Sequence, residues 1–149
     1  MLSAPPKTGP HGRLQLHAST VVINGNAVAF TGPAGSGKSG HALACLARGA
    51  VLLADDITWL EATGAGLIAH CPDTIIGQIE ARGIGILNAP THPPAPLTLI
   101  VDLGTHEPER LPDPKFINLL GHNVRLFHNP ETAHFADAIY HYMVHGLID

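Results

Sequence analysis

The chain has 149 residues and a formal net charge of −4, and 45% of its residues are apolar while only 13% are charged. This length and composition fit one domain with one hydrophobic core and exclude an intrinsically disordered chain. The slight acidic excess, with no basic patch, argues against nucleic acid and against an anionic membrane as partners.

Targeting and redox signals are also missing from the sequence. No apolar run reaches the length of a membrane span, and the first residues lack the apolar segment of a secretory signal. Cys45 and Cys71 match neither a disulfide framework nor a zinc-site spacing. We therefore expect a cytoplasmic, bacterial-type protein with reduced cysteines.

Apolar periodicity and turn residues predict the elements in chain order. The first half is predicted as a loose tail over 1–12, a strand pair over 14–23, a turn at 25–26, a strand over 27–30, a helix over 38–48 and a strand over 51–54. The second half is predicted as a hairpin over 57–71, a short helix within 72–79, a stretch whose periodicity Gly83 and Gly85 interrupt, and a proline-rich loop over 89–96. It continues as a strand over 97–101, a mobile polar segment over 104–114, strands over 116–120 and 124–127, and a helix over 131–145. This order predicts an α/β domain with a twisted central sheet and a helical C-terminal end.

The strongest motif lies between the predicted strand 27–30 and the helix that follows it. It reads Gly32-Pro33-Ala34-Gly35-Ser36-Gly37-Lys38-Ser39 and fits the phosphate-loop pattern G-x-x-x-x-G-K-[ST]. Glycines allow backbone N–H groups to turn toward phosphate oxygens, and the following helix points its positive end at them. Lys38 would reach the β- and γ-phosphates, and Ser39 would ligate Mg²⁺. The motif predicts binding of ATP, or a close relative, as its magnesium complex.

Two carboxylates follow the next apolar strand. Asp55 and Asp56 stand at its carboxyl end, the edge at which open α/β sheets bind ligands. A carboxylate there can hold the metal or accept a proton from an attacking hydroxyl. Neighbouring strand residues point in opposite directions, so we expect one role for each aspartate.

Other polar pairs are weak signals when taken alone. Glu80 and Arg82 would share a face of an extended segment, which by itself indicates a surface ion pair. His141 and His145 lie four apart in the last predicted helix and could share a metal. No third ligand is evident for them, and we interpret them as a solvated pair.

Taken together, these residues resemble the catalytic domain of HPr kinase/phosphorylase, the bacterial enzyme that phosphorylates a seryl hydroxyl of the phosphocarrier protein HPr. The family pattern is a strand histidine, a phosphate loop, an Ala-Asp-Asp strand end and a Glu-x-Arg-Gly-x-Gly-Ile signature. The chain has these in the same order: His17, the loop 32–39, Ala54-Asp55-Asp56, and residues 80–86. The resemblance covers about residues 12–145 and implies the phosphate-loop fold that the family shares with PEP carboxykinase.

The resemblance implies a ligand set of ATP and Mg²⁺. Lys38 and its loop would hold the phosphates, while Ser39 and Glu80 would ligate the metal.

The resemblance also implies the remaining catalytic roles. Asp55 or Asp56 would be the base of the kinase reaction and the acid of its reverse, and the choice between the two stays open. His17 and Arg82 would complete the site, and Arg110 would be the arginine of a mobile loop.

Two departures from the family pattern shape the expected activity. No counterpart of the family's amino-terminal domain precedes the motifs, which suggests the truncated alphaproteobacterial form, a single catalytic domain over 1–149. The family's late phosphorylase segment, which contains arginine and glycine, is replaced by residues 128–134, where no arginine stands. Arginine forks are strong anion donors, so we expect weak or absent phosphorylase activity.

The sequence therefore predicts an ATP- and Mg²⁺-dependent serine kinase acting on HPr or a related phosphocarrier. By family resemblance it would form a homo-oligomer, a hexamer. One alternative is a phosphate-loop small-molecule kinase, which usually needs a lid with several arginines. The other is a catalytically weak nucleotide-sensing module.

Overall fold

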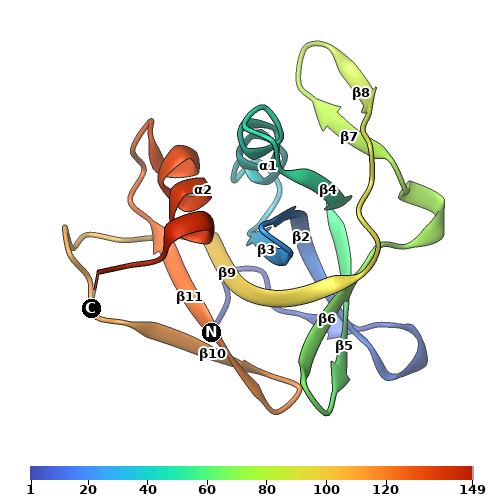
Figure 1. The fold of residues 1–149 in the computed structure, drawn as a ribbon, viewed down its shortest axis with the longest axis horizontal. Helices are drawn as coiled ribbons and strands as arrows, with labels where there is room; N and C mark the ends of the chain where they lie inside the picture. Colours follow the sequence, from blue (N-terminus) through green and yellow to red (C-terminus); the bar gives the residue numbers. More distant parts are fainter. Residues whose placement is uncertain (149) are drawn as a thin grey trace.

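The computed structural model describes residues 1–148 and is an α/β structure (Figure 1). Its helices and strands, in chain order, are β1 Lys7–Thr8, the 3₁₀ turn η1 Pro10–Gly12, β2 Leu14–Ile23, β3 Asn26–Thr31, α1 Lys38–Leu46, β4 Val51–Ala54, β5 Ile57–Thr63, β6 Gly66–His70, the 3₁₀ turn η2 Asp73–Ile75, β7 Gln78–Ala81, β8 Gly85–Asn88, β9 Ala95–His106, β10 Lys115–Leu119, β11 His122–Asn129 and α2 Phe135–His145.

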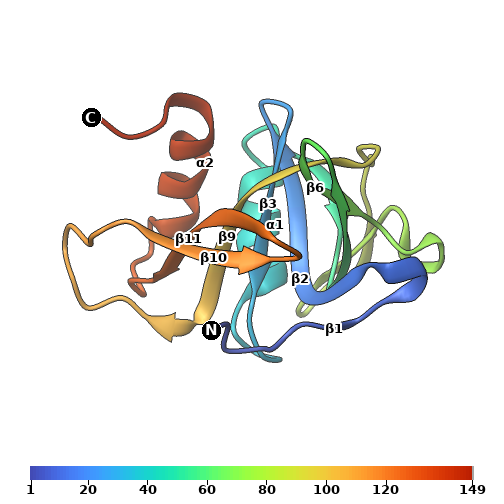
Figure 2. The same cartoon turned by 90° about the horizontal axis from the view of Figure 1, so that it is seen from below.

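The main sheet is mixed, and two long strands, β2 and β9, each serve two parts of it (Figure 2). The first residues of β2 pair with β5, whereas its later residues lie between β3 and β4. β9 pairs first with β6 and then lies between the parallel strands β3 and β11. The pairs β2–β5, β5–β6, β6–β9, β9–β3 and β3–β2 therefore close into a ring.

The strand pair predicted over 14–23 is in fact one strand of ten residues. No turn residue interrupts this stretch, so the chain changes pairing partner along its length instead of reversing. The reversal comes at Asn24 and Gly25, which have φ values of 53° and 81°, as a two-residue hairpin turn requires.

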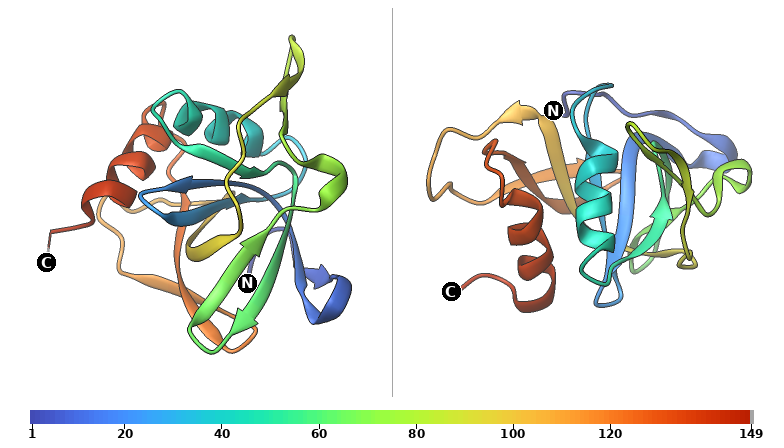
Figure 3. Two further views of the ribbon diagram at one scale, coloured as in Figure 1. Left: turned by 45° about the vertical axis from the view of Figure 1, so that its right-hand side comes forward. Right: turned by 90° about the horizontal axis from the view of Figure 1, so that it is seen from above.

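The central strands are buried on both faces, which explains their unbroken apolar sequences. In β3, Ala27 and Ala29 face one apolar cluster, inside the ring of strands. Val28 and Phe30 face a second cluster, on which α1 and α2 lie side by side (Figure 3). This division follows from the two-residue period of a strand.

Left-handed residues set the limits of both helices. α1 begins directly after Gly37, whose φ is 97°, and Gly49, with a φ of 114°, follows its end. α2 was predicted from residue 131, but Glu131 has a φ of 62° and cannot continue a helix. The helix therefore begins at Phe135. An ion pair of 2.6 Å at the surface joins Arg48, in the turn after α1, to Asp137 of α2.

The first twelve residues are more ordered than the loose tail that the sequence predicts. Leu2 is buried, and the backbone N–H and hydroxyl of Ser3 both donate to the buried carboxylate of Asp102 within β9. Lys7 and Thr8 form β1 against the start of β2. A buried carboxylate needs hydrogen-bond donors. Ser3 supplies two of them to Asp102, and these bonds hold the N-terminal segment against β9.

A hairpin stands where the sequence predicts only broken periodicity. β7 and β8 pair in antiparallel register and project from the body of the molecule (Figures 1 and 3). Gly83 and Gly85 were interpreted as interruptions, but their φ values of 87° and 136° serve the turn of this hairpin.

Both cysteines are free. Burial raises the pKa of the Cys45 thiol to about 12 and that of the Cys71 thiol to about 11. Both thiols are protonated at neutral pH, which makes either one a poor nucleophile.

None of the helices within residues 1–148 has the length and apolar character needed to cross a membrane.

Candidate functional site

A pocket of about 600 Å³ lies at the edge of the sheet where β3 and β4 end. β3 and β4 both run antiparallel to β2, so their carboxyl ends meet at this edge. The pocket is lined by His17, Ala34, Gly35, Gly37, Lys38, Ser39, Gly40, Leu43, Asp56, Glu80 and Arg82. Most of the residues that the sequence singles out are therefore brought together.

The loop between β3 and α1 has a backbone that only glycine adopts easily. Gly32, Gly35 and Gly37 have φ values of 152°, 83° and 97°. A Cβ atom on Gly32 would lie 2.5 Å from Ser36 Oγ, so a side chain does not fit there. Within the described residues, Ser36 Oγ is also buried without a hydrogen-bond partner. The first turn of α1 has no side-chain cap, which leaves its N–H groups available to an anion.

Lys38 supplies positive charge at the base of this loop. Its side chain is largely buried, and Nζ donates a hydrogen bond of 3.1 Å to the carbonyl oxygen of Pro33. Burial lowers the pKa of Lys38, and the nearby carboxylates of Asp56 and Asp55 oppose this shift. The amine has no other hydrogen-bond partner among the described residues, so it can exchange the carbonyl for a stronger acceptor.

Asp55 is buried and fully engaged as a hydrogen-bond acceptor. Its Oδ1 accepts from Ser19 Oγ at 2.6 Å and from Ser39 Oγ at 2.7 Å. Its Oδ2 accepts from the backbone N–H of Glu80 at 2.9 Å. A hydroxyl that donates its proton to Asp55 keeps its lone pairs free, so Ser39 can still ligate a cation.

Asp56 lies in a different environment, although it is the next residue. Its side chain is 62% exposed, and Oδ1 lies 2.5 Å from His17 Nε2. Its φ is 71°, and the N–H of Ile57 donates to the carbonyl of Asp55 at 2.8 Å. This is a classic γ-turn, a strained conformation in a non-glycine residue. The turn separates the two carboxylates, so one is fixed inside and the other faces the pocket.

His17 is held at the pocket by β2. Thr31, at the end of β3, donates its hydroxyl to the carbonyl oxygen of His17 at 3.0 Å. The imidazole lies against Asp56 and leaves this carboxylate partly open to solvent.

The β7–β8 hairpin closes one side of the pocket. Glu80 and Arg82 both line it, in keeping with the expectation that they share a face. The bond from the Glu80 N–H to Asp55 ties this hairpin to the end of β4.

The charged groups could hold a cation only together with a ligand. Within residues 1–148, no three His, Cys, Asp or Glu side chains form a preformed metal cluster. Mg²⁺ typically takes one or two protein carboxylates together with phosphates and water. A serine hydroxyl beside an aspartate, with Glu80 lining the same pocket, matches this chemistry.

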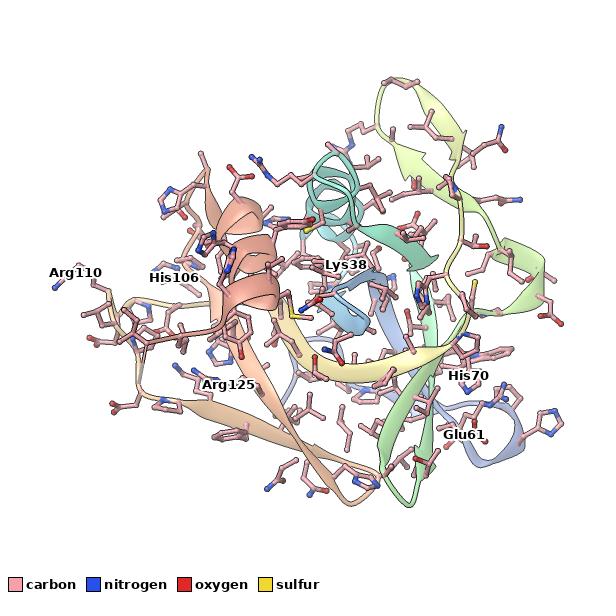
Figure 4. All side chains as sticks on the ribbon, viewed as in Figure 1. Lys38, Glu61, His70, His106, Arg110 and Arg125 are labelled. Carbon is pink, nitrogen blue, oxygen red and sulfur yellow. The ribbon has the colours of Figure 1, made fainter. Side chains whose placement is uncertain are left out.

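Arg110 and residues 128–134 do not line the pocket. Arg110 stands in the loop between β9 and β10, far from the hairpin (Figure 4). A second hollow, of about 780 Å³, surrounds Trp59 and His70 and contains none of the predicted site residues.

Ser19 belongs to the site but carries no motif in the sequence. It is fully buried, donates to Asp55 Oδ1 and accepts from the Asp56 N–H at 3.2 Å. A polar residue within the apolar run of β2 was the available signal, because a buried hydroxyl needs a partner.

Comparisons with known proteins define the family. The model described as "HPr Serine kinase C-terminal domain" matches residues 11–92. HPr kinase/phosphorylase of Clostridium botulinum (strain Eklund 17B / Type B) is 38% identical over 82 residues, which are 55% of this chain and 26% of that protein. The protein of the same name from Bordetella pertussis is 39% identical over 77 residues, 51% of this chain and 25% of that protein. The matched segments thus span about a quarter of these curated relatives.

A solved structure, described as the Hpr(Ser) kinase/phosphatase from Coxiella burnetii, has the same architecture. It matches with a TM-score of 0.73 and 28% identity, over 85% of this chain and 86% of that one. The fold is therefore an α/β domain with a mixed central sheet and a C-terminal helix, of a kind seen in a bacterial kinase. The chain belongs to the family of the HPr serine kinase C-terminal domain. The resemblance found in the sequence is confirmed.

Proposed function

We propose that this chain is a catalytic domain that uses MgATP to phosphorylate a seryl hydroxyl of HPr or a related phosphocarrier. One observation carries the proposal: a single pocket joins Lys38 and its glycine-rich loop to the Ser39–Asp55 pair and to the exposed Asp56–His17 pair. Phosphoryl transfer requires anion binding, charge neutralisation and a positioned base. In this proposal residues 1–149 act as one domain, and HPr implies a cytoplasmic setting.

Residues 32–39 would act as a phosphate loop. The positive φ values and the uncapped N-terminus of α1 direct N–H donors toward an anion. Lys38 would leave the Pro33 carbonyl for the β- and γ-phosphates. Ser39 and Glu80 would ligate Mg²⁺, whose charge would neutralise the phosphates.

Asp56 is the base in this proposal. Asp55 already accepts three hydrogen bonds, whereas Asp56 is exposed at the pocket and paired only with His17 among the described side chains. The seryl O–H proton passes to Asp56 as the seryl oxygen bonds to the γ-phosphorus. The bond between that phosphorus and the β–γ bridging oxygen breaks, and ADP leaves with the electron pair.

The openness of Asp56 favours a protein acceptor over a small molecule. Small-molecule kinases exclude water with a lid and clamp their substrates with several cations. Within residues 1–148, Lys38 and Arg82 are the only Lys or Arg side chains that line this pocket. A seryl side chain on a protein surface can reach Asp56 without any lid.

Purified protein incubated with ATP, Mg²⁺ and HPr tests the proposal. We expect one phosphoserine per HPr by mass spectrometry, and none on HPr whose target serine is alanine. ATP binding without transfer would instead indicate a nucleotide-sensing module, and transfer to a metabolite would indicate a small-molecule kinase. Light scattering on the same sample tests the expected hexamer.

Replacing Ser19 with alanine is expected to lower kcat about tenfold, with a smaller change in KM for ATP. The substitution removes the hydroxyl that holds Asp55 and the Asp56 N–H together, and loss of such buried partners costs about 1–3 kcal/mol of stability. Steady-state kinetics below the melting temperature measure the effect. Ser19→Thr keeps the hydroxyl and should restore most of kcat, and equal losses in both variants would contradict this positioning role.

Phosphorolysis of phosphoserine-HPr is expected to be weak or absent. This reverse reaction must bind inorganic phosphate as a nucleophile, and arginine forks are its best donors. Residues 128–134 contain no arginine, and Glu131 adds a negative charge near His106, at 3.8 Å. Pyrophosphate release from phosphoserine-HPr at millimolar phosphate measures the activity. Release as fast as the forward reaction would contradict the expectation.

A further inference from the structure

The β7–β8 hairpin exposes two large apolar side chains beside the candidate site. Ile84 is 77% exposed and Ile86 is 64% exposed. Their exposure contrasts with that of Ile79 on the same hairpin, which is buried against the helical face of the sheet. Isolated exposed apolar residues are common, so the position of this pair is what makes it informative.

The strand register places Ile86 on the face of the hairpin that meets the pocket. Glu80 pairs directly with Ile86, and Ile79 pairs with Leu87. Directly opposed residues point to the same face, with Cβ atoms about 5 Å apart. Ile79 and Leu87 therefore face the core, whereas Ile86 stands beside Glu80, which lines the pocket.

The turn carries Ile84 farther from the pocket on the same projecting element. Arg82, Gly83 and Ile84 connect the strands, and the Ile84 N–H donates to the Ala81 carbonyl at 3.0 Å. Ile84 therefore lies in the turn, beyond the last paired residues Ala81 and Gly85, whereas Ile86 lies within the paired strands. A single seryl side chain at Asp56 cannot contact both isoleucines, but the surface of a protein that carries the serine can.

We propose that Ile84 and Ile86 dock the phosphoacceptor protein, by contact with an apolar patch bordering its target serine. This inference rests on the proposed kinase function and adds the acceptor's docking site to it. The apolar pair is continuous with the pocket that contains Asp56 and Glu80, so a protein placing its hydroxyl at Asp56 covers the hairpin as well. Arg82, which is exposed in the turn of this hairpin and lines the pocket, adds a contact for an acidic or polar group of the acceptor.

The test compares Ile84→Ser/Ile86→Ser with a matched control that lies elsewhere. Leu111 and Phe116 are 77% and 61% exposed, on the loop before β10 and on β10 itself, and neither lines the pocket. Leu111→Ser/Phe116→Ser therefore removes similar exposed apolar surface. Binding of purified HPr is measured by calorimetry, with a non-hydrolysable MgATP analogue present.

The hairpin variant is expected to bind HPr at least about tenfold more weakly, which corresponds to losing burial of one to two isoleucines. Its affinity for the MgATP analogue and its melting temperature should stay unchanged, and the control should bind HPr as the parent does. An unchanged HPr affinity in the hairpin variant, or an equal loss in both variants, would overturn the docking proposal. A parent protein that does not bind HPr would also overturn the proposal. The same holds for a hairpin variant that binds HPr as the parent does but no longer self-associates in light scattering.

The same samples separate this inference from the proposed function. A parent protein that binds HPr through the hairpin but transfers no phosphate would retain the docking surface and contradict the kinase activity. A hairpin variant that phosphorylates HPr as fast as the parent does would retain the kinase activity and contradict the docking surface.

Discussion

Replacing Lys38 with alanine is expected to weaken binding of MgATP by at least about 100-fold while the fold stays intact. The amine is the one lysine at the pocket, and charge-assisted bonds to two phosphates contribute about 3 kcal/mol or more together. In the structure its only hydrogen bond goes to the Pro33 carbonyl. Burial lowers its pKa, so folding works against its charge. Its removal should therefore change the free energy of unfolding by no more than about 1 kcal/mol.

Isothermal calorimetry with ATP and magnesium measures the effect, and circular dichroism reports the fold. Lys7→Ala is the matched control, because Lys7 is an exposed lysine on β1 that does not line this pocket. An affinity in Lys38→Ala equal to that of the control would contradict the interpretation of residues 32–39 as a phosphate loop.

Local sequence patterns predicted most single elements but not how they combine. The apolar runs of β3 and β4 and the helix between them are where the sequence places them, because burial and turn residues leave a local signature. The pairing of β2 and of β9 with strands in two parts of the sheet has no such signature. A strand's own residues specify a buried face, whereas its partners are chosen by distant segments.

The same limit explains what the sequence left open at the site. Adjacent aspartates at a strand end indicate a functional carboxylate. Which of the two is buried and which faces the pocket depends on the γ-turn at Asp56 and on hydrogen-bond donors from three other segments. Ser19, the donor from β2, has no motif. The hairpin that carries Glu80 was missed because its glycines serve equally as breakers and as turn residues.

Replacing Asp56 with asparagine is expected to lower the rate of phosphoryl transfer to HPr by about 10²–10⁴-fold, the usual contribution of a general base. Asparagine has the same shape and keeps an oxygen, but it cannot take the seryl proton. The side chain is 62% exposed, and its one polar partner among the described residues is His17, so the fold and the affinity for MgATP should change little. Rapid-quench measurement of phosphoserine formation isolates the chemical step from product release.

Asp55→Asn is the control for this result, because we expect it to change the stability and the magnesium requirement and not the proton transfer itself. An amide at position 55 replaces one acceptor oxygen with a donor, which either faces the N–H of Glu80 or makes the hydroxyls of Ser19 and Ser39 turn their protons elsewhere. A buried donor facing a donor costs about 1–3 kcal/mol of stability. It also displaces Ser39, so the Mg²⁺ concentration needed for half-maximal rate should rise. If Asp56→Asn transfers phosphate at the parent rate, and Asp55→Asn slows transfer by about 10²-fold or more without changing the Mg²⁺ concentration needed for half-maximal rate, the buried aspartate is the base. The carboxylate best placed to accept a proton would then be the one that already accepts three hydrogen bonds, and the seryl group would have to enter beneath the loop and not from the open side of the pocket.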